Sequence, residues 1–168
     1  MTKNTFTFST VVIVIVLLFV ALTGTTTILT ATFDQTLGEP FFKETGKITG
    51  QKEIGPNRTQ ISYSANGTLK GDINVTNTGD FVSISRGNNL TFAQGQGVLS
   101  TPDGKETAKY NIIAVGNITQ EGKSVFLGAA AYHTNTTADL AFMNNVLGVF
   151  KAKLDDTGGF VSNEWEWK

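Results

Sequence analysis

The sequence predicts an all-β protein whose main domain is a single antiparallel closed barrel of about eight strands, preceded by an N-terminal transmembrane or signal helix. Apolar and polar residues alternate with a period of two in segments such as 60–65 and 80–86. Residues typical of tight turns separate these segments at short intervals. The chain also contains 18 Gly and only 16% charged residues, a composition that suits a β protein rich in turns. A β-sandwich is the alternative fold, but closure into a barrel removes exposed strand edges.

The first 31 residues form an apolar leader, and residues 32–168 form the predicted extracytoplasmic barrel domain. No charged residue lies between Lys3 and Asp34, and residues 11–22 are all apolar. This run fits the apolar core of a signal peptide, while the uncharged stretch around it is long enough to span a membrane as a helix. No clear cleavage site follows the run. A single anchor in the cell membrane with the barrel outside, and secretion after cleavage, therefore both remain open.

Strand patterns and turn signals place the elements of the barrel. The pair Asn66-Gly67 predicts a two-residue hairpin, Pro102 and Gly104 predict a type I turn, and a further turn is expected at 155–159. A short helical or irregular piece is expected around 137–145. Strands are expected near 45–54, 59–65, 68–76, 80–86, 89–100, 106–116, 123–133, 146–154 and 159–168. Coil points or bulges are expected at glycines inside strand patterns, namely Gly95, Gly97, Gly116 and Gly128.

Six Asn-x-Ser/Thr sequons provide a second indication of export. Composition alone predicts about 2.6 such sequons by chance. The excess indicates a glycoprotein with a glycan-coated surface, although Asn-Gly and Asn-Thr also mark turns and exposed strand faces. The candidate glycosylation sites are Asn57, Asn66, Asn74, Asn89, Asn117 and Asn135.

Charge and composition exclude several classes of function. The chain has 13 Lys and Arg against 14 Asp and Glu, so it lacks the basic character of a nucleic-acid-binding protein. It has no Cys and one His, which leaves no thiolate or His-cluster metal site. It also has no nucleophile elbow, phosphate-binding loop or dinucleotide fingerprint. We therefore expect no cofactor, no bound metal and no nucleic-acid partner.

The C-terminal third carries the most distinctive residues. The segment 140–168 contains Gly148-Val149-Phe150 after an Asn-rich turn and ends in Trp165-Glu166-Trp167, and a Gly-Gln-Gly-Val segment lies upstream at 95–98. In these features the chain resembles an uncharacterised family of small exported archaeal β-barrel proteins that also has soluble bacterial relatives. The resemblance implies a barrel of the calycin or allene-oxide-cyclase type, which in other proteins holds small apolar ligands or cyclises a fatty-acid epoxide. No residue of this chain matches a cyclase site.

Two pairs of residues are weak candidates for ligand binding. Trp165 and Trp167 lie two apart on a strand, so they point to one side and Glu164 points to the other. The indoles either seal one end of the core, with the carboxylates in solvent, or line a ligand cavity. Gln94 and Gln96 form a similar pair, which needs hydrogen-bond partners if it faces inward and none if it faces solvent.

His133 is the remaining ligand-binding candidate. It could act as a general base if a carboxylate such as Glu106 or Asp139 oriented it, but a lone His at a strand end also fits an exposed or structurally bonded residue. Asp155 and Asp156 lack the oxygen-ligand periodicity of a calcium loop, and a turn explains them. No catalytic residue is assigned.

Three functions remain open from the sequence. The first is a membrane-anchored or secreted β-barrel domain that binds a small amphipathic ligand without catalysis, or that serves as an envelope component. The first alternative is an accessory subunit of a membrane protein complex, suggested by the apolar run without a cleavage site. The second alternative is an isomerase similar to allene oxide cyclases, in which the fold mainly orients a substrate.

Overall fold

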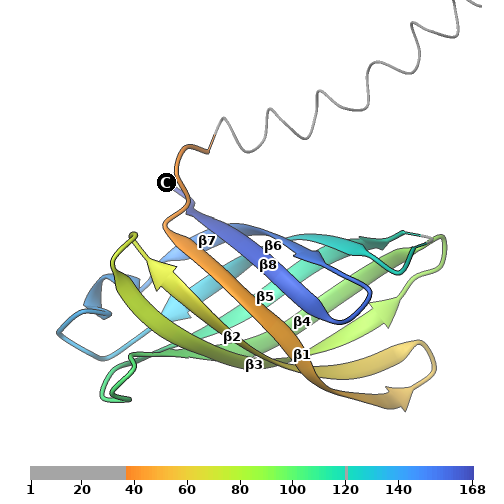
Figure 1. Cartoon of the computed structure of the whole chain (residues 1–168), viewed down its shortest axis with the longest axis horizontal. Helices are drawn as coiled ribbons and strands as arrows, with labels where there is room; N and C mark the ends of the chain where they lie inside the picture. The colour runs from red at the N-terminus through yellow and green to blue at the C-terminus, as the bar shows by residue number, and fades with distance from the viewer. Residues whose placement is uncertain (1–36, 120) are drawn as a thin grey trace, which may run out of the picture. The chain divides into compact units, whose positions relative to one another are not determined.

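The computed structural model describes residues 37–119 and 121–168, and the expected leader at 1–31 lies outside these residues. The compact unit that holds the barrel spans Glu39–Lys168. Its eight strands form a closed barrel in which each strand pairs with its neighbours in sequence and β8 pairs with β1 (Figure 1). All of these pairings are antiparallel. The predicted closed barrel is therefore confirmed, and the sandwich is excluded.

The strands follow one another with short connections, except for the longer β6–β7 connection that holds one 3-10 turn, η1. The helical piece expected around 137–145 is thus confirmed as a single turn. The elements are β1 (Phe42–Gly55), β2 (Arg58–Leu69), β3 (Ile73–Ser85), β4 (Leu90–Ser100), β5 (Thr107–Ile118), β6 (Ser124–His133), η1 (Ala141–Met143), β7 (Leu147–Leu154) and β8 (Gly159–Glu166).

The hairpin predicted at Asn66-Gly67 is wrong, because both residues lie inside β2 and pair with β1 and β3. The turn comes later, between Leu69 and Ile73. Gly67 faces inward beneath the ring of Phe42, and a Cβ at this position would lie 2.4 Å from the Cε2 atom of that ring. A glycine is therefore required at position 67 because the ring of Phe42 leaves no room for a side chain. The expected strands 59–65 and 68–76 are likewise not two strands joined by a hairpin at Asn66-Gly67.

The other two predicted turns are confirmed. The amide of Gly104 donates to the carbonyl of Thr101 at 2.8 Å, and Gly104 has a φ of 70°, in the left-handed region. In the β7–β8 turn, Asp155 Oδ1 accepts from the amides of Thr157 and Gly159, each at 2.9 Å. These bonds make an Asx turn and lower the pKa of Asp155, first through the side-chain bond from Thr157.

Six glycines inside strands lie directly opposite an aromatic residue on the adjacent strand. At Gly97, for example, an added Cβ would lie 2.2 Å from the hydroxyl oxygen of Tyr110 on the next strand. The register bulges occur elsewhere, in β1 near Gly50 and Gly55, so the bulges expected at the four interior glycines are wrong. The glycine–aromatic pairs are Gly46–Phe160, Gly79–Tyr63, Gly95–Phe81, Gly97–Tyr110, Gly116–Phe126 and Gly128–Phe150.

The β6–β7 connection packs into one end of the barrel. Leu140 and Met143 have no exposed surface and join a core cluster that includes Leu69 and Leu99. Figure 1 shows this connection at the same end as the β2–β3 and β4–β5 turns. The ammonium of Lys70 lies 3.6 Å from the ring centroid of Phe142, the middle residue of η1. This end of the barrel is therefore closed by a buried apolar cluster.

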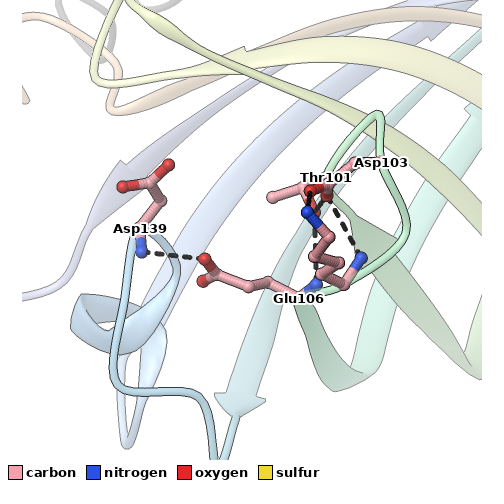
Figure 2. Close-up of polar contacts among 5 residues, drawn as sticks. Thr101, Asp103, Glu106 and Asp139 are labelled. Atoms are coloured by element: carbon pink, nitrogen blue, oxygen red, sulfur yellow. Dashed lines mark hydrogen bonds and ion pairs between the residues drawn. The ribbon is translucent and has the colours of Figure 1, made fainter.

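Glu106 forms hydrogen bonds to the β6–β7 connection. Its carboxylate accepts hydrogen bonds from the amides of Leu140 at 2.8 Å and Asp139 at 3.2 Å, and from the hydroxyl of Thr136 at 2.9 Å. Figure 2 shows the bond from Asp139 to Glu106, beside the turn that begins at Thr101. These donors lower the pKa of Glu106, the Leu140 amide most of all. The carboxylate of Glu106 therefore holds the β6–β7 connection in place, and its contact with Asp139 is a hydrogen bond from the Asp139 backbone amide.

Candidate functional site in the barrel interior

A cavity of about 90 Å³ lies inside the barrel and is lined by side chains from all eight strands. Twelve of its nineteen lining residues form two groups, which we call the deep end and the mouth. The deep end lies toward the closed end of the barrel and consists of Glu44, Tyr63, Asn77, Tyr110, Tyr132, Ser162 and Glu164. The mouth lies toward the β7–β8 turn and consists of Ile48, Phe81, Phe126, Leu154 and Phe160.

A chain of hydrogen bonds crosses the deep end and finishes on a carboxyl group. The hydroxyl of Tyr110 donates to Asn77 Oδ1 at 2.6 Å, and the Asn77 amide donates to Glu44 Oε2 at 2.7 Å. Tyr63 and Tyr110 share a further hydrogen bond. Because Tyr110 has already given its only proton to Asn77, Tyr63 must be the donor to Tyr110. The direction of donation therefore runs from Tyr63 to Glu44.

A second donor and carboxyl pair lies beside this chain. The hydroxyl of Tyr132 donates to Glu164 Oε2 at 2.7 Å, and Glu164 is only 4% exposed. Its other oxygen, Oε1, is buried without a hydrogen-bond partner among the described residues and lies next to Gly148. A buried polar atom without a partner costs free energy, so it is an unusual feature of a folded core.

Burial makes both carboxyl groups weak acids. Burial raises the pKa of Glu44 to about 7, against the opposing effect of the hydrogen bond from Asn77. Burial also raises the pKa of Glu164 to about 8, opposed by the bond from Tyr132 and supported by the nearby charge of Glu44. The pKa values of Tyr63, Tyr110 and Tyr132 are raised by burial as well, so the hydroxyls stay protonated. The lining contains no Lys, Arg or His to balance the carboxylates.

The mouth has a different chemistry. All five of its side chains are apolar and half-buried, which places this end of the cavity nearer to solvent than the deep end. The ring of Phe160 meets the ring of Tyr63 edge to face, with 5.8 Å between centroids, and so joins the two ends. The cavity as a whole can therefore accommodate a molecule with one polar and one apolar part.

The five ligand-binding candidates from the sequence are not brought together at this cavity. Trp165 is 3% exposed but alternates with the inward Glu164, and Trp167 is 62% exposed. Gln94 and Gln96 are exposed and border a shallow outer groove. His133 is exposed, with Nδ1 3.0 Å from Asn144 Oδ1. None of the five is among the residues that line the cavity.

The sequence reasoning missed the polar residues of the deep end. The expectation that the carboxylates opposite the indoles face solvent is wrong for Glu164, which is buried. A signal was available, since Phe160, Ser162 and Glu164 share one face of β8 and the first of them is apolar. The same signal was present for Asn77, which shares a face of β3 with Val75, and for Glu44, which shares a face of β1 with Phe42.

The six sequon asparagines are all exposed. Asn57 and Asn89 lie in turns or at their edges with positive φ values of 59° and 61°. Within residues 37–119 and 121–168, no helix is long and apolar enough to cross a membrane. Over the same residues, no group of three or more His, Cys, Asp or Glu side chains is placed to hold a metal ion.

The fold and the cavity define a class: closed, eight-stranded, antiparallel barrels with the strands in sequential order and a partly polar interior. Comparison with solved structures finds the same fold in proteins of unknown function. One is a conserved protein from Rhodopseudomonas palustris, with a TM-score of 0.63, 16% identity, and coverage of 76% of this chain and 94% of that one. A protein from Clostridium acetobutylicum has a TM-score of 0.64 and 14% identity, covering 77% and 98%.

A third similar structure is a β-barrel-like protein from Acinetobacter baumannii, with a TM-score of 0.62, 13% identity, and coverage of 77% of this chain and 94% of that one. No protein-family model matches the chain, and no curated protein matches it either. At these identities the likeness shows the fold alone. The structural neighbours are consistent with the expected group of uncharacterised barrels, and they assign no chemistry to the cavity.

Proposed function

We propose that this protein is a non-catalytic binding protein that holds a small amphipathic molecule inside its barrel, outside the cell membrane and tethered by its N-terminal segment. The observation that carries the ligand half of this proposal is the cavity, which is polar at its deep end and apolar at its mouth. A molecule entering through the mouth would place its polar group against Glu44 and Glu164 and its apolar part against the phenylalanines. The tether is supported by the apolar run at 11–22.

The size of the cavity limits the ligand. A volume of about 90 Å³ equals the liquid volume of about three water molecules, so the ligand is a small molecule and not a long lipid chain. Benzyl alcohol, with one ring and one polar group, is a suitable probe. Binding to the native state alone raises thermal stability, which gives a direct measurement.

Two neighbouring alanines on β6 provide a matched test. Ala130 lines the cavity and Ala131 is exposed on the outer face. We expect benzyl alcohol to raise the melting temperature of the wild type and of Ala131→Leu, but not of Ala130→Leu, because the larger side chain fills the cavity. If all three proteins respond equally, or if none responds and calorimetry detects no binding, the ligand half of the proposal is wrong.

The tether has its own experiment. Intact-mass measurement of the protein from membranes of its native host is expected to show that residues 1–31 are retained. The same measurement reports any glycan at the sequons. A processed protein that is recovered from the cytosol would contradict the tether and the outside location, whatever the result of the ligand experiment.

A second candidate function, an accessory subunit of a membrane complex, is favoured by an apolar patch on the outer wall. Ile113 and Val115 on β5 are 59% and 55% exposed, and Leu127, directly opposite Val115 on β6, is 49% exposed. Exposed apolar patches of this kind often mark protein interfaces. Chemical crosslinking in native membranes would then capture a partner with an apolar surface. Recovery of the protein as a free monomer after mild solubilisation would oppose this function.

A further inference from the structure

The deep end of the cavity has used the hydroxyl protons of its three tyrosines and keeps spare acceptors. The hydroxyls of Tyr63, Tyr110 and Tyr132 all donate to groups of the barrel itself. Both donor chains finish on carboxyl groups, and Glu164 Oε1 is buried without a hydrogen-bond partner in the part of the chain that the structure describes. A ligand group that meets this end finds carboxyl oxygens that can accept further hydrogen bonds. When both carboxyl groups are ionised they can only accept, so a ligand group that contacts them must be a donor.

The two carboxyl groups are close neighbours on the cavity wall. Glu164 pairs with Phe42 across the β1–β8 ladder, and Glu44 is the next inward residue after Phe42 on β1. Diagonal neighbours of this kind lie about 7–8 Å apart, with their Cβ atoms somewhat closer, which lets one small group reach both side chains. Ser162, which is paired with Glu44, adds a hydroxyl to the same region.

Charge at the deep end has one sign. The lining carries two acidic side chains and no basic one, so two ionised carboxylates would repel each other in a place of low polarity. A cation placed between them would relieve this repulsion and would satisfy the free oxygen of Glu164. A ligand carboxylate would add a third negative charge.

From this arrangement, and resting on the proposed ligand-binding function, we infer that the ligand is an amine, whose ammonium group donates hydrogen bonds to Glu44 and Glu164 while its apolar part packs against the mouth. The chemical class is a small primary amine with an aromatic or aliphatic body. Charge-assisted hydrogen bonds are about twice as strong as neutral ones, so the head group decides which molecules of a given size bind well.

Three probes with the same ring test this inference on the full chain: benzylamine, benzyl alcohol and benzoate. At about pH 8.5, calorimetry is expected to show benzylamine binding at least about tenfold more tightly than benzyl alcohol, with benzoate the weakest. Glu164→Gln and Glu44→Gln are expected to remove most of the preference for benzylamine, so that its affinity falls close to that of benzyl alcohol for the same variant. Glu166→Gln on β8 and Glu53→Gln on β1 remove the same charge from exposed positions and are expected to behave as wild type.

The dependence on pH gives an independent readout. Benzylamine stays cationic from about pH 6 to about pH 8.5, whereas Glu44 and Glu164, with pKa values of about 7 and 8, ionise across this range. The other titratable groups that face the cavity are Tyr63, Tyr110 and Tyr132, which remain neutral because burial raises the pKa of each. Benzylamine affinity is therefore expected to rise about tenfold or more with pH, and benzyl alcohol affinity to stay flat.

The outcomes distinguish a failure of the amine inference from a failure of the proposed ligand-binding function. If benzyl alcohol binds as tightly as benzylamine at high pH, or benzoate binds best, the amine inference is overturned and the ligand-binding function stands. If no probe binds at any pH, both are overturned. If the preference for benzylamine persists unchanged in Glu164→Gln and Glu44→Gln, the amine inference fails, because the charge is then recognised elsewhere.

Discussion

The deep end and the mouth of the cavity are built by the same strands but differ in polarity. On β8 the difference arises within five residues, since Phe160 belongs to the mouth and Glu164 to the deep end. At the deep end Asn77, Tyr110 and Glu164 are each at most 5% exposed, so their polar atoms must find partners inside the protein. At the mouth the half-buried side chains carry no polar atoms and need none.

The contrast indicates what the two ends are for. Apolar side chains could close the deep end at a lower cost in desolvation, as they do in the neighbouring cluster around Leu140. A polar network that uses its donors internally and leaves a carboxyl oxygen without a partner does not maximise stability. It is, however, what an interior site for a donor ligand requires. The predictions below test whether the two ends differ in packing, in charge and in hydrogen bonding.

The largest effect is expected from removing one aromatic ring at the closed end of the barrel, beside the deep end, and one at the mouth. Phe42 is 2% exposed and covers Gly67, so Phe42→Ala is expected to lower the free energy of unfolding by about 3–5 kcal/mol. Phe160 is half-buried at the mouth, so Phe160→Ala is expected to cost less, about 1–2 kcal/mol. Urea denaturation of both variants measures the difference. Equal losses would show that the mouth is packed as tightly as the closed end.

Local patterns in the sequence were sufficient to predict the fold class and most of the turns. The alternation of side chains predicted inward and outward faces, and Gly104 and Asp155 marked turns through their own backbone and side-chain chemistry. Asn66-Gly67 was misread because a glycine required by a turn and a glycine required by a neighbouring ring look alike in the sequence. The ring that requires Gly67 is Phe42, which lies on another strand.

The candidate site was less predictable than the fold. Sequence reasoning favoured the rare residues Trp165 and His133 and overlooked tyrosine, although all three tyrosines of the chain line the cavity. Tyr63 and Tyr110 come into contact only through the closure of the barrel, across 47 positions of sequence. The alternation of β8 places Glu164 on the inward face, but the degree of its burial also depends on the neighbouring strands and the closed end. Long-range packing therefore determines the site.

The second prediction concerns charge at the deep end. The folded state holds protons on Glu44 and Glu164 up to pH values of about 7 and 8, while the unfolded chain releases them near 4.5. The unfolded state then binds fewer protons, so the free energy of unfolding is expected to fall as pH rises from about 4.5 to about 8. At about 1.4 kcal/mol per pKa unit, the ionisation of each group lowers this free energy by about 3–5 kcal/mol. Glu164→Gln cannot ionise and is expected to lose less stability over this range.

Chemical denaturation at about pH 5 and about pH 8 measures this effect. Glu164→Gln is expected to resemble the wild type at the lower pH and to be more stable than it at the higher pH. Glu166→Gln, two residues along β8 and exposed, is the matched control and is expected to follow the wild type at both values. A wild type whose stability does not change between them would mean that neither carboxyl group is buried as the structure places it.

The smallest effect is expected from removing single hydroxyls of the donor chain. Tyr110→Phe leaves Asn77 Oδ1 without its donor and Tyr63 without its acceptor, so it is expected to cost about 1–3 kcal/mol. Tyr63→Phe removes only the first donor of the chain and leaves the bond from Tyr110 to Asn77 in place, so about 0.5–1.5 kcal/mol is expected.

Equilibrium unfolding of the two single variants and of the double variant distinguishes a connected chain from separate bonds. If the hydroxyls act as one chain, the cost of the double variant is smaller than the sum of the single costs, because both variants lose the bond between the tyrosines. Strict additivity would mean that the hydroxyls contribute independently. In that case the polar groups of the deep end would each form their hydrogen bonds independently of the others. The deep end would then differ from the mouth in the polarity of its side chains, but it would not contain a connected hydrogen-bond network.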